Sequence, residues 1–282
     1  MTVEKIENIM DTEYRNLINK INENLISIFI IGSMKDQHTE LKKYNDYDLR
    51  IVVKVMNKYT YEVIKNFNER IKKILQNYNL NVDYSFIIGP VRHITKSETN
   101  LLIHCLPMTE DTLEGLPLTH RYSYSCNYRI IYGMDIIKKY NNIRFTGKDV
   151  IECTEGIDYC IQMIKSNTIQ YGIWKEKNDK IQVFDEKREM NDYMLFEVLR
   201  YSILKSLDNT MKIISWKNKF VPKDIKKRLE IVYVEINDEM MNKIDMLLNG
   251  TFEQYIKNKE EIKKYTLIIL EKIKKYILTN SL

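Results

Sequence analysis

The sequence predicts an α+β protein, with a small mixed sheet and its helices in the N-terminal part and an all-α C-terminal part. In the first 110 residues, short β-branched and apolar runs alternate with segments of helical period. After about residue 120 the apolar residues mostly recur every three or four positions, as in helices. The length of 282 residues indicates about two domains, and we expect them at 1–135 and 136–282.

The first three expected elements are a helix and two strands. Apolar residues spaced mostly three or four apart predict an amphipathic helix over 3–25. The run ISIFIIGS at 26–33 predicts a buried strand that ends in a tight turn at Gly32 and Ser33. After the polar stretch MKDQHTELKKYN, the segment DYDLRIVVKV predicts a second strand that begins near Asp46.

A helix and two further strands complete the expected N-terminal part. Residues of helical period predict a helix over 60–77. The segment LNVDYSFIIG predicts a strand at 80–89 that stops at Gly89 and Pro90. The apolar run NLLIHCLPM predicts a fourth strand at 100–108, which completes the small mixed sheet.

The C-terminal part is expected to be helical, apart from one connector. The polar segment KEKNDKIQVFDEK predicts that connector at 175–187. The change from the mixed part to the helical part should lie within 115–145. The expected helices cover residues 122–140, 147–174, 188–217, 222–232, 236–247 and 251–279.

Charge and composition exclude several classes of protein. The chain has 44 Lys and Arg residues against 39 Asp and Glu, and the net charge of +5 is too small to indicate a nucleic-acid-binding protein. No apolar run approaches the roughly 18 residues of a membrane span. The N-terminus has no secretory signal, and the four cysteines have neither CxxC spacing nor a disulfide framework, which favours a cytoplasmic protein.

Two segments at strand ends carry residue types suited to binding phosphate and metal. Gly32 allows a ligand to approach the backbone closely, and the Ser33 hydroxyl beside turn N–H groups suits a phosphate oxygen. Asp46 and Asp48 point to one face of a strand, where two carboxylates repel unless a divalent cation such as Mg²⁺ lies between them. Taken separately, these segments also fit a plain turn and a solvent-exposed strand end.

Asp83 is an acid inside the apolar strand NVDYSFII, where an unpaired buried carboxylate is costly. If this strand lies beside the strand of Asp46 and Asp48, three carboxylates meet near the Gly-Ser turn. Three acids can hold two metal ions, an arrangement used for in-line displacement at phosphorus. The alternative is an ion pair between Asp83 and a neighbouring Lys or Arg.

The order of these features resembles a known superfamily. A strand ending in Gly-Ser, an Asp-x-Asp that opens the next strand, and a later hydrophobic–Asp–hydrophobic strand resemble the nucleotidyltransferase superfamily with the DNA polymerase β-like core. The matching residues are Gly32, Ser33, Asp46, Asp48 and Asp83. The helical C-terminal half is similar in layout to that of the aminoglycoside and lincosamide nucleotidyltransferases. The chain departs from the usual motif at Asn45, where the family often has Ser, and it lacks a second Gly in the loop, which favours a helical loop.

The resemblance implies a reaction and a role for each residue. It implies transfer of a nucleoside monophosphate from an NTP, ATP above others, to a hydroxyl of an aminoglycoside-like antibiotic, with release of pyrophosphate. Asp46 and Asp48 would bind two Mg²⁺ ions, and Asp83 would complete the metal site or accept the proton of the acceptor hydroxyl. The Gly-Ser turn would hold the β and γ phosphates, while Arg50 would contact phosphate or form a salt bridge.

Some alternatives stay open from the sequence. The chain is also compatible with a nucleotidyltransferase that modifies tRNA or a partner protein, as in toxin–antitoxin systems, or with a non-catalytic nucleotide-binding relative. We expect a monomer or a homodimer. The four histidines lack mutual metal spacing and are expected to be structural or exposed. The lysines that are candidates to reach the triphosphate are Lys205, Lys212, Lys217, Lys219 and Lys223.

Overall fold

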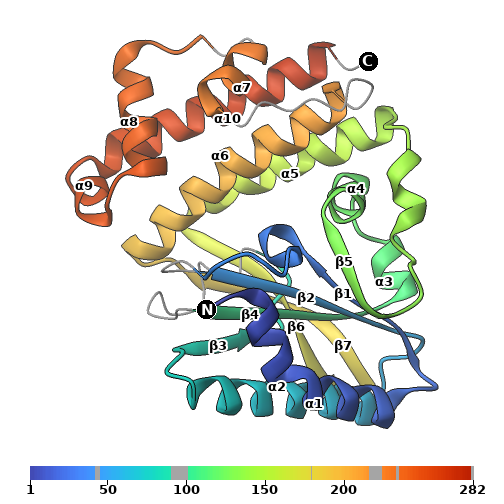
Figure 1. Cartoon of the computed structure of the whole chain (residues 1–282). Coiled ribbons are helices and arrows are strands. Elements are labelled where there is room, and N and C mark those ends of the chain that lie inside the picture. Colours follow the sequence, from blue (N-terminus) through green and yellow to red (C-terminus); the bar gives the residue numbers. More distant parts are fainter. Residues whose placement is uncertain (42–44, 90–100, 179, 216–223, 233–234, 281–282) are drawn as a thin grey trace. The chain divides into compact units, whose positions relative to one another are not determined.

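The computed structural model describes residues 1–282 apart from 42–44, 90–100, 179, 216–223, 233–234 and 281–282 (Figure 1). The chain divides into two compact units. Unit 1 consists of Met1–Leu116, His120–Ile143 and Tyr171–Glu186, and unit 2 consists of Pro117–Thr119, Arg144–Gln170 and Lys187–Leu282. The α+β class predicted from the sequence is confirmed. Within the described ranges, no helix is long and apolar enough to cross a membrane.

Unit 1 is built, in its described residues, on a five-stranded mixed sheet in the order β3-β4-β2-β1-β5. The strand β1 runs antiparallel to β2 and β5, whereas β4 runs parallel to β2 and β3. The strands are β1 Leu25–Ile31, β2 Asn45–Val53, β3 Val82–Ser85, β4 Leu101–Thr109 and β5 Tyr128–Gly133. A short 3-10 helix, η1, covers Gly32–Lys35 directly after β1, so the loop begins helically.

Two helices, α1 (Val3–Ile21) and α2 (Lys58–Gln76), pack side by side on one face of the sheet (Figure 1). Both helices begin at capping residues, because the side chains of Thr2 and Asn57 accept hydrogen bonds from backbone N–H groups of the first turn. Their apolar stripes and the helix-facing strand residues form the main core. This core includes Ile6, Met10, Leu17, Ile28, Ile30, Leu49, Ile51, Phe67, Ile71 and Ile103.

The opposite face of the sheet carries a second apolar cluster, formed with the chain that follows β4. This stretch contains the helices α3 (Glu110–Glu114) and α4 (Leu118–Cys126) and the 3-10 helix η3 (Lys138–Asn142). The cluster consists of Ile26, Phe29, Val52, Leu106, Met108, Leu113, Ile137 and Tyr140. Val52 lies near the C-terminal end of β2, whereas Asp46 and Asp48 lie nearer its N-terminal end. The cluster therefore covers the C-terminal end of β2.

The helix predicted over 122–140 is wrong from residue 127 onward. α4 ends at Cys126, and the next residues form β5, which pairs with β1. The β-branched and aromatic residues of YRIIYG favour a strand on the sheet edge over a helix. At its end, Gly133 has φ +85°, and a Cβ there would lie 2.2 Å from the Ile26 carbonyl oxygen, so this position requires glycine.

A two-stranded sheet, β6 (Thr168–Lys177) and β7 (Lys180–Glu189), replaces the helix end and the polar connector that the sequence predicts there. The preceding helix stops because Asn167 adopts the left-handed conformation with φ 53°. The residues of TIQYGIWKEK that follow include Ile, Tyr and Trp, which favour a strand. Two backbone hydrogen bonds of 2.9 and 2.8 Å between Ile88 and Gly172 attach β6 to the chain after β3.

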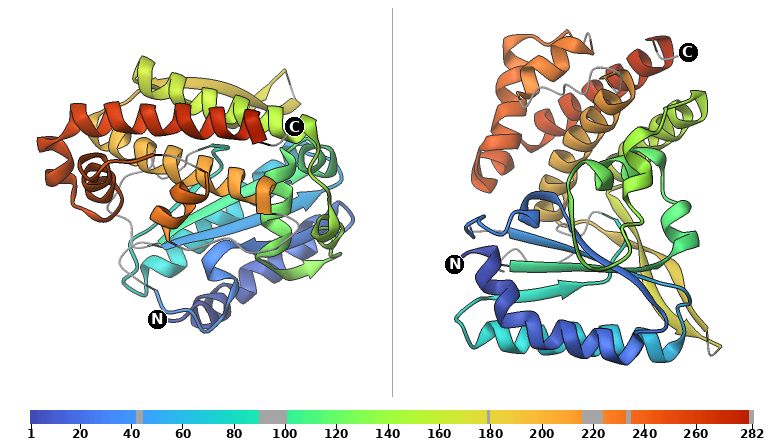
Figure 2. Two further views of the ribbon diagram at one scale, coloured as in Figure 1. Left: turned by 90° about the horizontal axis from the view of Figure 1, so that it is seen from above. Right: turned by 45° about the vertical axis from the view of Figure 1, so that its right-hand side comes forward.

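Unit 2 is mainly helical, and α5, α6 and α10 pack against one another to form its core (Figure 2). The helices in its described residues are α5 Gly147–Ser166, α6 Asp192–Ser215, α7 Ile225–Ile231, α8 Asp238–Asn249, α9 Phe252–Lys257 and α10 Lys259–Asn280. The single helix predicted over 251–279 is therefore two helices with a break at Asn258. The Asn258 side chain donates a hydrogen bond of 2.9 Å to the Gln254 carbonyl and so ends α9 locally.

Candidate active site

The strand β2 divides its side chains between the two faces of the sheet. Tyr47 and Leu49 are buried against the helices α1 and α2. Asp46, Asp48 and Arg50 alternate with them and therefore lie on the opposite face. Both acids are partly exposed, whereas Arg50 is buried. The structure thus brings two carboxylates to one face, at the end of β2 that the second apolar cluster leaves uncovered.

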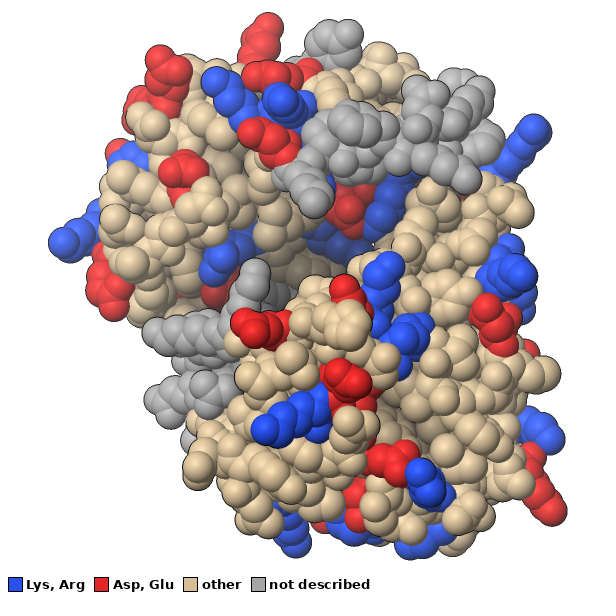
Figure 3. All heavy atoms as spheres, in the orientation of Figure 1, with Lys and Arg blue, Asp and Glu red and all other residues tan. Residues whose placement is uncertain are grey.

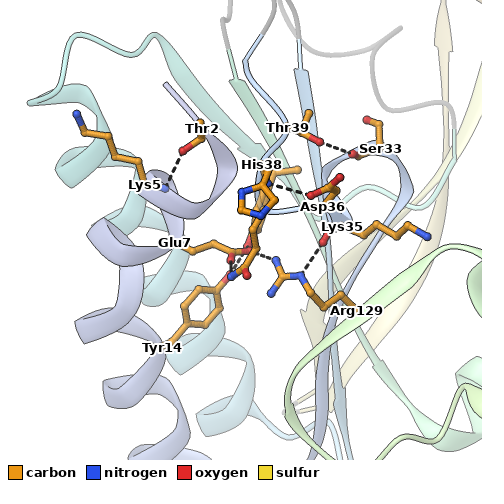
Figure 4. Close-up of polar contacts among 12 residues, drawn as sticks. Thr2, Lys5, Glu7, Tyr14, Ser33, Lys35, Asp36, His38, Thr39 and Arg129 are labelled. Atoms are coloured by element: carbon orange, nitrogen blue, oxygen red, sulfur yellow. Dashed lines mark hydrogen bonds and ion pairs between the residues drawn. The ribbon is translucent and has the colours of Figure 1, made fainter.

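Gly32 lies directly beside the Asp48 carboxylate. Ile31, the last residue of β1, pairs with Asp48 in the sheet, and the chain then turns at Gly32 with φ +81°. A Cβ at Gly32 would lie 3.4 Å from Asp48 Oδ2. Ser33 is exposed in the following 3-10 turn, where its carbonyl accepts a hydrogen bond of 3.4 Å from Thr39 Oγ1 (Figure 4). The predicted turn and acid pair are therefore neighbours in space.

Arg50 is a buried cation whose partners lie around Asp48. Its Nη2 is 3.6 Å from Asp48 Oδ1, and its Nη1 donates to the carbonyls of Leu49 and His104 at 3.0 and 3.1 Å. The guanidinium lies 5.4 Å from the ring centre of Tyr124. Burial opposes its charge, but Tyr124 and Asp48 more than offset this and raise the pKa of Arg50. Of the two predicted roles, the structure shows the salt bridge, and contact with phosphate stays a prediction.

His104 is a functional candidate that the sequence analysis misses. Its Nδ1 is 2.9 Å from Asp48 Oδ1, and its Nε2 is 3.0 Å from the Ile87 carbonyl oxygen. Each ring nitrogen therefore faces an oxygen that accepts hydrogen bonds, and the ring is held between Asp48 and the chain after β3. A sequence signal exists, because His104 is the one histidine in the largely apolar run NLLIHCLPM. Its relevance follows only from the pairing of His104 with Asp48 between β4 and β2.

Asp83 does not lie beside the other two acids. The expectation that its strand neighbours that of Asp46 is wrong, because β4 lies between β3 and β2. Asp83 and Asp46 both pair with Leu102 of β4, which separates their backbones by two strand spacings, about 10 Å. β4 is buried along most of its length and takes the place next to β2, whereas the short β3 lies at the edge.

Lys72 of α2 neutralises Asp83 in the structure. Its Nζ is 3.0 Å from Asp83 Oδ1, which also accepts a hydrogen bond of 2.9 Å from the Tyr84 backbone N–H. This is the ion pair that the sequence analysis leaves open as the alternative. Among the described residues, no group of three or more His, Cys, Asp or Glu side chains is arranged to hold a metal ion. The role of Asp83 as a metal ligand or as the base stays a prediction.

Two of the candidate lysines lie on α6 of unit 2. Burial, together with the charge of Lys212, lowers the pKa of Lys205 to about 8. Lys212 itself forms an ion pair with Asp208, one turn earlier. The other candidates, Lys217, Lys219 and Lys223, lie outside the described residues. Contact between any of these lysines and a triphosphate stays a prediction.

The comparisons with known proteins place these elements in a known fold. No protein-family model matches the sequence, and no curated protein matches it significantly. A similar solved structure is the crystal structure of the spectinomycin adenyltransferase AAD(9) from Enterococcus faecialis with ATP and spectinomycin. The two chains are 14% identical, with a TM-score of 0.52 over 93% of this chain and 98% of the other. The predicted resemblance is confirmed at the level of the fold, and this chain has a nucleotidyltransferase fold with a helical C-terminal part.

Proposed function

We propose that this protein is an enzyme that transfers a nucleoside monophosphate from an NTP, ATP above others, to a hydroxyl group of a small molecule. The observation that carries the proposal is the position of the Gly32 turn against the Asp48 carboxylate. This position occurs in a fold shared with an adenyltransferase along 93% of the chain. A tight glycine turn beside paired acids suits a nucleotide whose phosphates contact both the backbone and a metal ion.

The residues of this site fit a magnesium ion held by Asp46 and Asp48. Both carboxylates lie on one face of β2 and are partly exposed, and Mg²⁺ binds proteins through one or two carboxylates together with substrate phosphates. When bound, the ion neutralises the charge that develops on the transferred phosphoryl group. A second ion would need a further ligand. Asp83 could supply it only if its ion pair with Lys72 opened, so we propose one ion at Asp46 and Asp48, and a second ion is only what the resemblance implies.

Residues around Asp48 fix the direction of its carboxylate. His104 on the neighbouring strand β4 and Arg50, two residues further along β2, contact the same oxygen of Asp48, Oδ1. Gly32 lies on the side of the other oxygen, Oδ2. Groups that hold a ligating carboxylate in one orientation reduce the reorganisation needed when metal and substrate bind. We infer that His104 and Arg50 orient Asp48, while the glycine turn leaves space for phosphate next to it.

The proposed acceptor is an aminoglycoside-like antibiotic. The similar solved structure contains ATP and spectinomycin, and 98% of that chain aligns here, so the likeness includes the helical part as well as the sheet. On the face drawn in Figure 3, Lys and Arg side chains are interspersed with Asp and Glu. A mixed surface of this kind favours a small acceptor over a polynucleotide, whose binding depends on clustered positive charge. The four free thiols suit the reducing cytoplasm where ATP is available.

Label transfer tests this proposal. The purified protein is incubated with Mg²⁺ and each of the four NTPs labelled at the α-phosphate, in the presence of spectinomycin, other aminoglycosides, lincosamides or bulk tRNA. We expect labelled antibiotic and released pyrophosphate with ATP, and no product after chelation of the metal by EDTA. The Asp46→Asn variant should form no product while keeping its circular-dichroism spectrum. Label on tRNA alone would replace the proposed acceptor, and no label on any acceptor would contradict the proposal.

A further inference from the structure

Glu7 is an acidic residue of α1 that lies behind the candidate site. Only 12% of its side chain is exposed, and it faces the sheet instead of solvent. A carboxylate removed from water is costly unless several donors satisfy it. The donors that surround Glu7 come from three separate segments of unit 1, and two of these segments carry the residues of the candidate site.

The first donor is Tyr47, which lies between Asp46 and Asp48 in the sequence. Its side chain points to the helix-facing side of β2, and its hydroxyl donates to Glu7 Oε1 at 2.9 Å. The hydroxyl oxygens of Tyr14 and Tyr47 lie 3.0 Å apart. Burial raises the pKa of both tyrosines, so both keep their protons. Since Tyr47 donates to Glu7, Tyr14 donates to Tyr47, and the chain of hydrogen bonds fixes the strand segment that carries both acids.

The second donor is Arg129 of β5, which connects Glu7 to the glycine turn (Figure 4). Its Nη2 forms an ion pair with Glu7 Oε1, the oxygen that Tyr47 also contacts. Its Nε donates a hydrogen bond of 2.6 Å to the carbonyl of Lys35, the last residue of η1. Gln37, two residues later, donates to Glu7 Oε2 at 2.9 Å. One carboxylate therefore holds the end of the Gly32–Lys35 turn from two directions.

The N-terminus of α1 holds the same loop through its backbone. The N–H groups of Val3 and Glu4 donate to the carbonyls of Thr39 and Gln37 at 3.0 and 2.9 Å. These N–H groups have no partner within the helix, so the loop satisfies them. Glu7 thus acts from a helix that is already docked against the loop.

We propose that Glu7 is a positioning residue, which sets the Gly32–Lys35 turn at a fixed place relative to Asp46 and Asp48. The proposal rests on the proposed function for its kinetic part and on the contacts of Glu7 for its structural part. The turn follows β1 and the acid pair lies on β2. Glu7 Oε1 accepts from Tyr47 of β2 and pairs with Arg129, whose Nε in turn donates to the Lys35 carbonyl of the turn. A displacement of about 1 Å between groups that contact the same substrate costs on the order of 100-fold in rate.

The same helix offers a closely matched control. Glu13 of α1 forms an ion pair with Arg70 of α2, with 2.5 Å between Oε2 and Nε. The exposed fractions are 10% for Glu13 and 34% for Arg70, against 12% for Glu7 and 28% for Arg129. This pair links the two helices, and among the described residues it forms no hydrogen bond or ion pair with the turn or with β2. Loss of either carboxylate therefore removes a similar ion pair, but only one loss reaches the candidate site.

The test compares Glu7→Gln with Glu13→Gln in the full chain. The measurements are the melting temperature, hydrogen exchange of the amides of 32–41, and kcat and KM for the NTP. For Glu7→Gln we expect exchange of these amides to rise about tenfold. We also expect kcat to fall about 10- to 100-fold, while KM changes less. For Glu13→Gln we expect a similar loss of melting temperature, with exchange in 32–41 and kcat close to those of the wild type.

The outcomes separate this inference from the proposed function. Equal effects of the two substitutions on exchange in 32–41 and on kcat would overturn the positioning role of Glu7. If the wild type transfers nucleotide to no acceptor, the proposed function fails, and the exchange measurement alone decides whether Glu7 fixes the turn. If Glu7→Gln does not fold, Gln37→Leu removes a single donor to the same carboxylate, the one that lies in the loop itself. This variant should also raise exchange in 32–41, and unchanged exchange would contradict the inference.

Discussion

The two faces of β2 differ in what their side chains contribute. On the helix-facing side, Leu49 and Ile51 are fully buried in the main core, and each such residue stabilises the fold by about 1.5–3 kcal/mol. On the other side, Asp46 and Asp48 are partly exposed carboxylates that repel each other. One strand therefore builds the sheet with one set of alternate residues and carries the candidate site with the other. Substitutions on the two faces should separate stability from activity.

The largest expected effects on activity and stability come from substitutions of Asp48 and Leu49, neighbours in β2 whose side chains lie on opposite faces of the sheet. Asp48→Asn keeps the size of the side chain and an oxygen that accepts from His104, so the fold should persist. Removing its charge should lower nucleotidyl transfer about 100- to 1000-fold, the usual cost of losing a group that stabilises transition-state charge. Leu49→Ala should lower the free energy of unfolding by about 2–5 kcal/mol, because it leaves a cavity in the core. Its remaining folded fraction should keep the specific activity of the wild type.

Urea titration and initial rates at saturating NTP measure these two effects. If Asp48→Asn lowers stability as much as Leu49→Ala while activity per folded molecule persists, the face of β2 that carries Asp46 and Asp48 is structural. That result would remove the distinction between the two faces.

A smaller effect should distinguish two glycines beside β1, Gly32, which directly follows this strand, and Gly133, which ends β5 and pairs with Ser27. Both Gly32 and Gly133 have positive φ, so alanine costs about 1–2 kcal/mol at either position through its backbone alone. At Gly133 the new methyl group also overlaps the Ile26 backbone, and Gly133→Ala should lose more stability than Gly32→Ala. At Gly32 the methyl group meets the Asp48 carboxylate instead. For Gly32→Ala we therefore expect kcat/KM per folded molecule to fall about tenfold, in addition to the loss of stability.

Thermal unfolding and kcat/KM for the NTP, measured on both alanine variants, test this pair. Equal losses of specific activity would mean that the methyl group at 32 acts only through the backbone. The proposed contact between the turn and phosphate would then lose its support.

The alternation of polar and apolar residues correctly predicts which side chains of β2 share a face, because successive side chains of any strand point to opposite faces. The acids at 46 and 48 and the turn at 32 lie where their spacing predicts. The place of Asp83 is not predictable in this way, since the order of strands depends on which strand buries best. The long apolar run at 101–109 takes the place next to β2, and it brings His104 to Asp48 instead.

Two other features are hidden from the sequence for different reasons. Glu7 resembles any surface acid on an amphipathic helix, because its donors come from β2, β5 and a loop that are distant along the chain. The hairpin at 168–189 follows a left-handed residue, Asn167, that ends the helix earlier than the apolar period indicates. Side-chain pattern predicts local conformation, but it does not predict which distant segment supplies a partner.

The smallest expected effect is that of Asp83→Asn, a substitution in the edge strand β3. In the structure Asp83 pairs with Lys72, and both side chains are about one-third exposed, so the pair contributes only about 0–1 kcal/mol to stability. Since β4 separates Asp83 from Asp46, we expect transfer to fall by less than about threefold. Lys72→Met serves as the matched control, because it removes the other half of the same pair. A loss of about 1000-fold for Asp83→Asn alone would mean that the ion pair opens and Asp83 joins the acids of β2 during the reaction.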